Sequence, residues 1–164
     1  MKTKIHLLFV LFVMAVMVNA QTKNDSTSKI GIGGMIGLPT GVMSTGYNLA
    51  YGFDLKAEFG VAPNLAITLS AGYLNWVGKS GYGGTTGLIP ALGGLKCYFS
   101  DKVYGSAEAG LSFSTNSGGG NAFTFSPGVG YKVTDKFDVM LKYQDASKNG
   151  VSIAHLGLRA GLTF

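Results

Sequence analysis

The feature that most constrains the fold is a two-residue alternation between apolar residues and small or polar ones, which runs through most of the chain after residue 28. The final stretch, IAHLGLRAGLTF, shows it clearly: Leu and Ala alternate with Gly, His and Arg. A period of two is typical of β-strands that have two unlike faces. The alternation appears in eight segments, at residues 29–38, 47–60, 65–77, 87–99, 103–115, 121–133, 136–146 and 151–164. The sequence therefore predicts an all-β protein of eight strands.

The connections between these segments alternate in length. Four longer ones, rich in Gly, Ser, Thr and Asn, are interleaved with three tight ones; the longer are 39–46, 78–86, 116–120 and 147–150, the tight 61–64, 100–102 and 134–135. This pattern indicates an antiparallel up-and-down meander with the longer loops at one end, as in transmembrane barrels. Pro90 and Pro127 fall inside two segments, where we expect a bulge or a late strand start because proline cannot donate to a ladder.

The composition of the two faces predicts which face is turned outward. Charged residues make up 13% of the chain, against about 25% in ordinary soluble domains, and the polar face is mostly Gly, Ser, Ala and Thr. Rings such as Tyr51 and Phe53, repeated around eight strands, would overfill an eight-stranded interior. The segments are also long enough for tilted membrane strands, which need about 9–11 residues. We therefore predict an eight-stranded antiparallel up-and-down transmembrane β-barrel; the alternative is a soluble barrel of the lipocalin kind.

The first twenty residues read as a secretory signal. Lys2 and Lys4 precede an apolar run at 7–18, and small residues end it at Ala20. This run is too short for a membrane-spanning helix, which needs about 20 apolar residues. We expect residues 1–20 to be a cleaved signal peptide, 21–28 a short polar N-terminal tail and 29–164 the barrel. The remaining positive charge is mild and scattered, so nucleic acid is not an expected partner.

The chain resembles the small eight-stranded outer-membrane barrels of Gram-negative bacteria, of the OmpA transmembrane-domain and OmpX type. The resemblance is carried by the signal peptide, the eight alternating segments and the ending LGLRAGLTF. It implies location in the outer membrane, contact with outer-membrane lipid and lipopolysaccharide, and biogenesis through periplasmic chaperones and the outer-membrane assembly machinery. In that family a terminal aromatic preceded by alternating apolar residues resembles the assembly signal. The matching residues are Phe164, Leu162, Ala160, Leu158 and Leu156.

Charged residues on the polar face are expected to form a network inside the lumen. Its candidate members are Lys56, Glu58, Lys96, Glu108, Asp138, Lys142 and Arg159. Glu108 and Arg159 each lie five residues from the same membrane side, so we expect them at similar depth. Charges in a narrow lumen must pair, because an unpaired one costs several kcal/mol. Two interpretations remain open: a structural plug, or a gated polar path for protons or small ions.

The sequence does not indicate a catalytic or metal-binding site. His155 is the only histidine after the signal, Ser152 lies on the opposite face by parity, and no acid is nearby in the sequence. We therefore predict no catalytic residue, and no cofactor or metal site, because no cluster of ligands is apparent. Aromatic residues near the strand ends fit interfacial girdles, and ordinary strand propensity is the alternative explanation; they are Tyr47, Trp76, Tyr98, Phe99, Tyr104, Tyr131, Phe137 and Phe164.

These observations predict a non-enzymatic, small integral outer-membrane barrel with a structural or interaction role in the cell envelope. Its lumen is expected to be filled by a polar salt-bridge network. Two alternatives remain: an envelope enzyme that modifies lipid A or phospholipid, and a narrow pore for small solutes.

Overall fold

The computed structural model describes residues 28–81, 84–116 and 118–164. The predicted signal peptide (1–20) and residues 21–27 of the predicted tail lie outside them. The elements are β1 (Ser28–Thr40), α2 (Met43–Gly46), β2 (Tyr47–Ala62), β3 (Leu65–Gly78), β4 (Thr85–Tyr98), β5 (Val103–Ser114), β6 (Asn121–Lys132), β7 (Phe137–Lys148) and β8 (Val151–Thr163). No helix among the described residues is both long and apolar enough to span a membrane.

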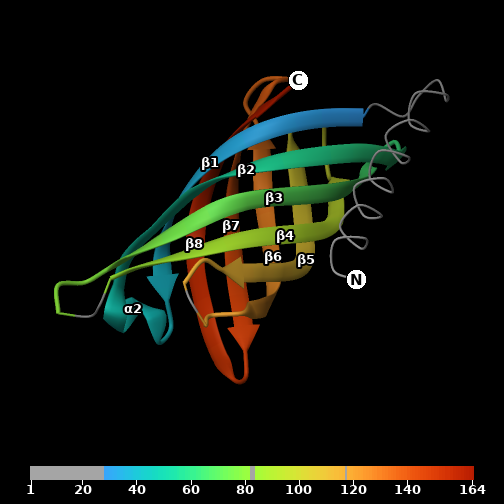
Figure 1. Ribbon diagram of the computed structural model, residues 1–164. Coiled ribbons are helices and arrows are strands. Elements are labelled where there is room, and N and C mark those ends of the chain that lie inside the picture. The colour runs from blue at the N-terminus through green and yellow to red at the C-terminus, as the bar shows by residue number, and fades with distance from the viewer. Residues whose placement is uncertain (1–27, 82–83, 117) are drawn as a thin grey trace, which may run out of the picture.

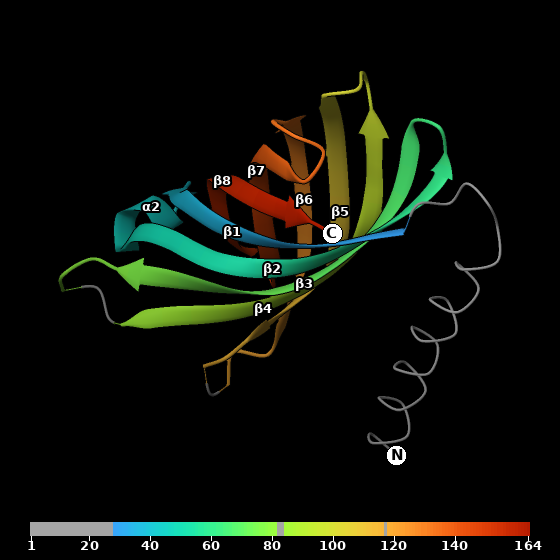
Figure 2. The same ribbon diagram turned by 90° about the horizontal axis from the view of Figure 1, so that it is seen from above.

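The eight strands form one closed antiparallel barrel in sequence order (Figure 1). β1 pairs with β2 on one side and with β8 on the other, from Gly31 opposite Thr163 to Thr40 opposite Ala154. Figure 2 shows β1 lying between these two strands. Closure matters because hydrocarbon offers no hydrogen-bond partner to a free strand edge. The predicted eight-stranded antiparallel up-and-down transmembrane β-barrel is confirmed.

The connections divide the barrel into two ends. The loop end carries the connections after β1, β3, β5 and β7, and α2 lies there. The turn end carries residues 63–64, 99–102 and 133–136 together with the start of β1 and the end of β8. The last loop-end connection is shorter than predicted, because β7 and β8 extend to leave only Asn149 and Gly150 between them. Both have positive φ, 50° and 81°, the conformation that an Asn-Gly hairpin turn requires.

The two internal prolines interrupt pairing without shifting it. The β3–β4 ladder lacks pairs between Ala71–Ala91 and Leu74–Leu88, beside Pro90, and the β6–β7 ladder has a similar gap beside Pro127. The register is the same on both sides of each gap, so the predicted bulge or late start is wrong. A true irregularity lies instead in β2, between Tyr47 and Leu49.

The outer wall is apolar and the lumen contains the charges. Phe53, Leu111 and Leu158 are 57%, 40% and 53% exposed, whereas Glu108 and Arg159 are 2% and 4% exposed. A soluble barrel would have the opposite arrangement, since its bulky apolar side chains fill the interior. The outer wall is therefore the lipid-contacting surface and the soluble alternative fails.

Candidate functional site: the barrel lumen

Two layers of side chains fill the lumen. The polar layer, toward the turn end, contains four acidic and four basic side chains: Asp54, Glu58, Glu108, Asp138, Lys56, Lys96, Lys142 and Arg159. The hydrophobic layer, toward the loop end, is a packed cluster of Ala50, Leu74, Trp76, Leu88 and Ala146. Each layer is built from inward-facing residues of alternate positions on several strands, so the barrel walls fix their places.

Arg159 is the centre of the polar layer. Its Nε lies 2.7 Å from Asp54 Oδ2 and its Nη2 lies 2.6 Å from Asp54 Oδ1, a forked arrangement. Its Nη1 also lies 3.9 Å from Asp138 Oδ1. The hydroxyl of Tyr104 donates a hydrogen bond to Asp138. Bidentate pairing of a guanidinium with a carboxylate is among the stronger polar contacts in proteins, so this group holds β2, β7 and β8 together across the lumen.

Two further ion pairs lie beside this group. Lys96 Nζ donates to Glu58 Oε1 over 2.6 Å, and the Tyr98 hydroxyl donates to Glu58 Oε2 over 3.2 Å. Lys56 Nζ lies 3.1 Å from Glu108 Oε1. With equal numbers of acidic and basic groups, the layer can be buried without a net charge, which limits its desolvation penalty.

Lys142 differs from the other three bases. It is buried, yet none of the ion pairs between described residues includes it. Its neighbours in the ladders on either side are Gly128 and Gly157. It is therefore held inside the lumen between two glycines, without a fixed ion-pair partner among the described residues.

All seven charged residues selected from the sequence face inward and are buried. The selection omitted Asp54, which supplies the bidentate partner of Arg159. Asp54 lies on the same face of β2 as Lys56, two residues away, so the same alternation could have found it. Glu108 and Arg159 do not pair with each other: Glu108 pairs with Lys56, and Arg159 with Asp54.

The aromatic residues do not all form girdles, and that prediction is wrong for four of them. Trp76, Tyr98 and Tyr104 have the inward parity of their strands, and Tyr47 lies beyond the β2 irregularity, which turns it inward. Tyr47 and Trp76 pack edge to face, with ring centroids 5.8 Å apart. The lumen is thus less uniformly small and polar than predicted. Of the eight predicted girdle residues, Phe99, Tyr131 and Phe164 have exposed rings.

His155 is part of the lumen packing. Its ring meets Trp76 edge to face at a centroid separation of 5.2 Å, and neither ring nitrogen has a hydrogen-bond partner among the described residues. Ser152 faces the other way, where its hydroxyl donates to Asp145 Oδ1 over 2.5 Å. Serine, histidine and acid therefore do not assemble into a nucleophile–base arrangement. The described residues contain no group of three or more His, Cys, Asp or Glu side chains suited to a metal ion.

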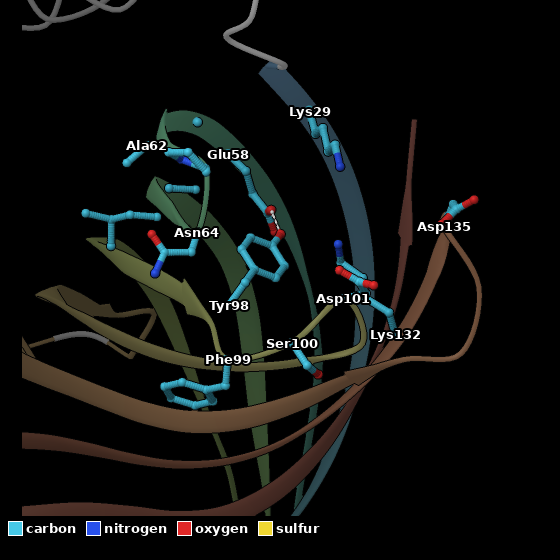
Figure 3. A pocket seen from close by; sticks show the side chains of 14 residues that line it. Lys29, Glu58, Ala62, Asn64, Tyr98, Phe99, Ser100, Asp101, Lys132 and Asp135 are labelled. Atoms are coloured by element: carbon cyan, nitrogen blue, oxygen red, sulfur yellow. Dashed lines mark hydrogen bonds between the residues drawn. The ribbon is translucent and has the colours of Figure 1, made fainter.

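The turn end opens into a polar cavity of about 550 Å³. Figure 3 shows Glu58 and Tyr98 hydrogen-bonded in it, with Lys29 and Asp135 on one side. Lys132 Nζ lies 4.2 Å from the centre of the Tyr98 ring. Two smaller spaces, both lined in part by Glu58 and Asp138 of the polar layer, measure about 10 Å³ each, close to the room that one water molecule occupies. Behind this wide entrance lie the buried charged side chains of the polar layer.

The C-terminal residues lie on the outer wall of β8, beside the seam with β1. The outward-facing leucines and Phe164 are exposed, Phe164 by 79%. The Phe164 backbone N–H donates to the carbonyl of Ile30 over 2.8 Å. The residue is thus tied down by its backbone while its ring stays accessible.

Comparison with known proteins supports this architecture. The family model described as outer membrane protein beta-barrel domain matches residues 8–164. No curated protein matches the chain in sequence. Among solved structures, Ail of Yersinia pestis in a phospholipid bilayer nanodisc gives a TM-score of 0.61 at 15% identity, over 85% of this chain and 100% of Ail.

Two other structures are similar. The N-terminal β-barrel domain of Pseudomonas aeruginosa OprF gives a TM-score of 0.55 at 14% identity, over 85% of this chain and 100% of that domain. The outer membrane enzyme PagL gives 0.60 at 17% identity, over 80% of this chain and 98% of PagL. At these identities the likeness concerns the fold alone.

Proposed function

We propose that this chain, which belongs to the outer membrane protein beta-barrel domain family, is a closed barrel with a structural or interaction role in the cell envelope. Family membership gives its location, the outer membrane. The filling of the lumen supports a role without transport. Two spaces lined by polar-layer residues measure only about 10 Å³ each, and the hydrophobic layer lies between the polar layer and the loop end. An ion would have to leave its water and cross both layers, so the barrel acts through its surfaces rather than as a conduit.

Conductance tests this proposal against the pore alternative. The barrel is inserted into planar lipid bilayers and single-channel currents are recorded in concentrated salt. We expect no discrete openings from the wild-type chain. The matched variant Trp76→Ala/Leu88→Ala truncates two of the large side chains of the hydrophobic layer, and it should stay closed because the polar layer remains. Regular wild-type openings would overturn the proposal and support a small-solute pore.

The structural role needs a test in cells. Deleting the gene should raise sensitivity to detergents and leakage of periplasmic proteins, and the wild-type gene should restore both. If loss of the gene leaves the envelope intact, the structural role is contradicted. The interaction role would then remain, and it is measured by capture of partners on intact cells. Outer-membrane lipid, including lipopolysaccharide, is the expected contact of the outer wall.

The enzyme alternative can be tested directly. It depends on His155, whose ring is enclosed and lies on the opposite face from Ser152. Purified barrel is incubated with lipopolysaccharide and with phospholipid, and the products are examined by mass spectrometry. We expect no turnover by the wild type. Turnover that disappears in His155→Asn, while the variant remains folded on an unheated denaturing gel, would establish the enzyme instead.

We also propose that residues 1–20 are removed on export and that the end of β8 is the assembly signal. The accessible Phe164 ring and the outward leucines Leu162, Leu158 and Leu156, with Ala160 between them, support the second point. Periplasmic chaperones and the assembly machinery would bind this segment before the barrel closes.

A further inference from the structure

The loop end contains a second cavity, different in character from the polar one at the turn end. Its volume is about 350 Å³, at the low end of the range of ~300–1,000 Å³ found for small-molecule sites. Leu88, Ala122, Ala146 and Ile153 supply apolar walls. Leu88 and Ala146 also belong to the hydrophobic layer, so the floor of this cavity is the surface of that layer that faces the loop end.

The cavity has polar groups at its rim, whereas the buried Ser112 in its lining is already hydrogen-bonded to Thr124. Lys148 and Asn149 lie where β7 ends, and Ser114 lies where β5 ends. Lys148 Nζ donates to the carbonyl of Gly119 over 2.8 Å, which holds the ammonium at the mouth. Apolar walls with a few polar groups on one side are characteristic of sites for amphiphilic ligands, and barrel mouths are a common place for them.

The charges indicate which head group would fit. None of the ion pairs between described residues includes Lys148. The acid closest in sequence, Asp145, accepts hydrogen bonds from Ser147 and Ser152 instead. The inward-facing acids belong to the polar layer, on the far side of the hydrophobic layer. The rim therefore offers an ammonium without a carboxylate partner to whatever enters.

We propose that this cavity binds a small amphiphile with a carboxylate head and a short alkyl chain, such as a free medium-chain fatty acid. The carboxylate pairs with Lys148 at the rim, and the chain lies against Leu88, Ala122 and Ile153. The small volume favours a free acid over the acyl chain of an intact lipid. This binding goes beyond the structural role and does not depend on it, because a ligand in the loop-end cavity is compatible with a closed lumen.

Fluorescence of Trp76, the only tryptophan in the chain, gives a direct readout. Trp76 packs in the same cluster as Leu88 and Ala146, so a ligand on this floor changes its surroundings. The barrel in phospholipid nanodiscs is titrated with decanoate, decanol, butyrate and a lysophospholipid. We expect a saturable change with decanoate, weaker binding of decanol, and none of butyrate or the lysophospholipid.

Variants separate the site from partition into the lipid. Lys148→Gln should weaken decanoate binding about tenfold or more, because a charge-assisted contact is lost, and should leave decanol unchanged. Ala122→Phe should abolish binding of both by filling the cavity. The matched control is Lys79→Gln, a loop-end lysine whose Nζ instead donates to the Ser44 carbonyl; it should bind decanoate normally. Either of two results would overturn the proposal. One is a Trp76 fluorescence change that rises linearly with decanoate concentration and is identical in all variants; the other is saturable binding of the lysophospholipid that decanoate does not displace.

Discussion

Removing either member of the Arg159–Asp54 pair is the sharpest test of whether the ion pairs in the lumen stabilise the barrel. At an effective dielectric constant of about 20, unit charges 2.6 Å apart attract by about 6 kcal/mol and charges 3.9 Å apart by about 4 kcal/mol. In Asp54→Asn, Arg159 keeps Asp138, so we expect a loss of about 3 kcal/mol in the free energy of unfolding, the lower end of the range for breaking a buried pair. In Arg159→Met, Asp54 is left without its cation and Asp138 loses its own, so we expect about 5 kcal/mol.

The double variant distinguishes pairing from two independent losses. Asp54→Asn/Arg159→Met leaves no unpaired charge at this position except Asp138, which keeps the Tyr104 hydroxyl. We expect it to be more stable than the sum of the single losses predicts, by about 2–3 kcal/mol. The measurement is urea unfolding in phospholipid vesicles, followed by Trp76 fluorescence.

The matched control is Lys136→Met. Lys136 is an exposed lysine of the β6–β7 turn, and its removal should change stability by less than about 0.5 kcal/mol. The reasoning is refuted if both single variants unfold within 1 kcal/mol of the wild type and the double variant shows additive effects, because that result means the lumen is hydrated enough to screen its charges.

Three further outcomes follow from the structure. Gly130→Ala directs a methyl group into the Tyr104 ring and should destabilise the barrel by about 1–3 kcal/mol in urea, whereas Gly34→Ala, which meets nothing within 4 Å, should be nearly neutral. Leu158→Arg on the lipid face, midway along β8, should cost about 2–4 kcal/mol in the same assay; no loss would mean that this face does not contact hydrocarbon. Deleting Phe164 should reduce the amount of barrel in outer-membrane fractions while leaving refolding in detergent unchanged, and an equal defect in both would indicate a stability role instead.

The period-two alternation predicted most of the fold because every strand has one face in lipid and one in the lumen. Strand limits agreed to within two residues. The largest differences are at residues 39–40, 61–62, 85–86 and 147–148, where the strands continue into segments that composition assigned to connections. Parity also separates the two faces, as Phe53 outside and Glu108 inside demonstrate. These features depend only on local sequence, which is why a single chain reveals them.

The pairing of the lumen charges could not be predicted in the same way. Partners such as Arg159 and Asp54 come from β8 and β2, with β1 between them, and their meeting depends on the register of two ladders. The irregularity at Tyr47 also leaves no clear sequence signal, yet it moves an aromatic ring from the lipid face into the lumen. Trp76 is a different case: its parity placed it inward, but its position near a strand end suggested a girdle.

The abundance of glycine, 26 of 164 residues, follows from the same packing. Glycine weakens a strand, since it loses much conformational freedom and contributes no side chain. In this lumen it provides the space that the large polar groups occupy. Asp54 lies opposite Gly33 in β1 and Gly72 in β3, and a Cβ at Gly33 would lie 2.6 Å from Arg159 Nε. A larger residue there would push the guanidinium away from its carboxylate. The glycines and the ion pairs are therefore one arrangement, in which the strand propensity lost at a position such as Gly33 makes room for the buried pair of Arg159 and Asp54.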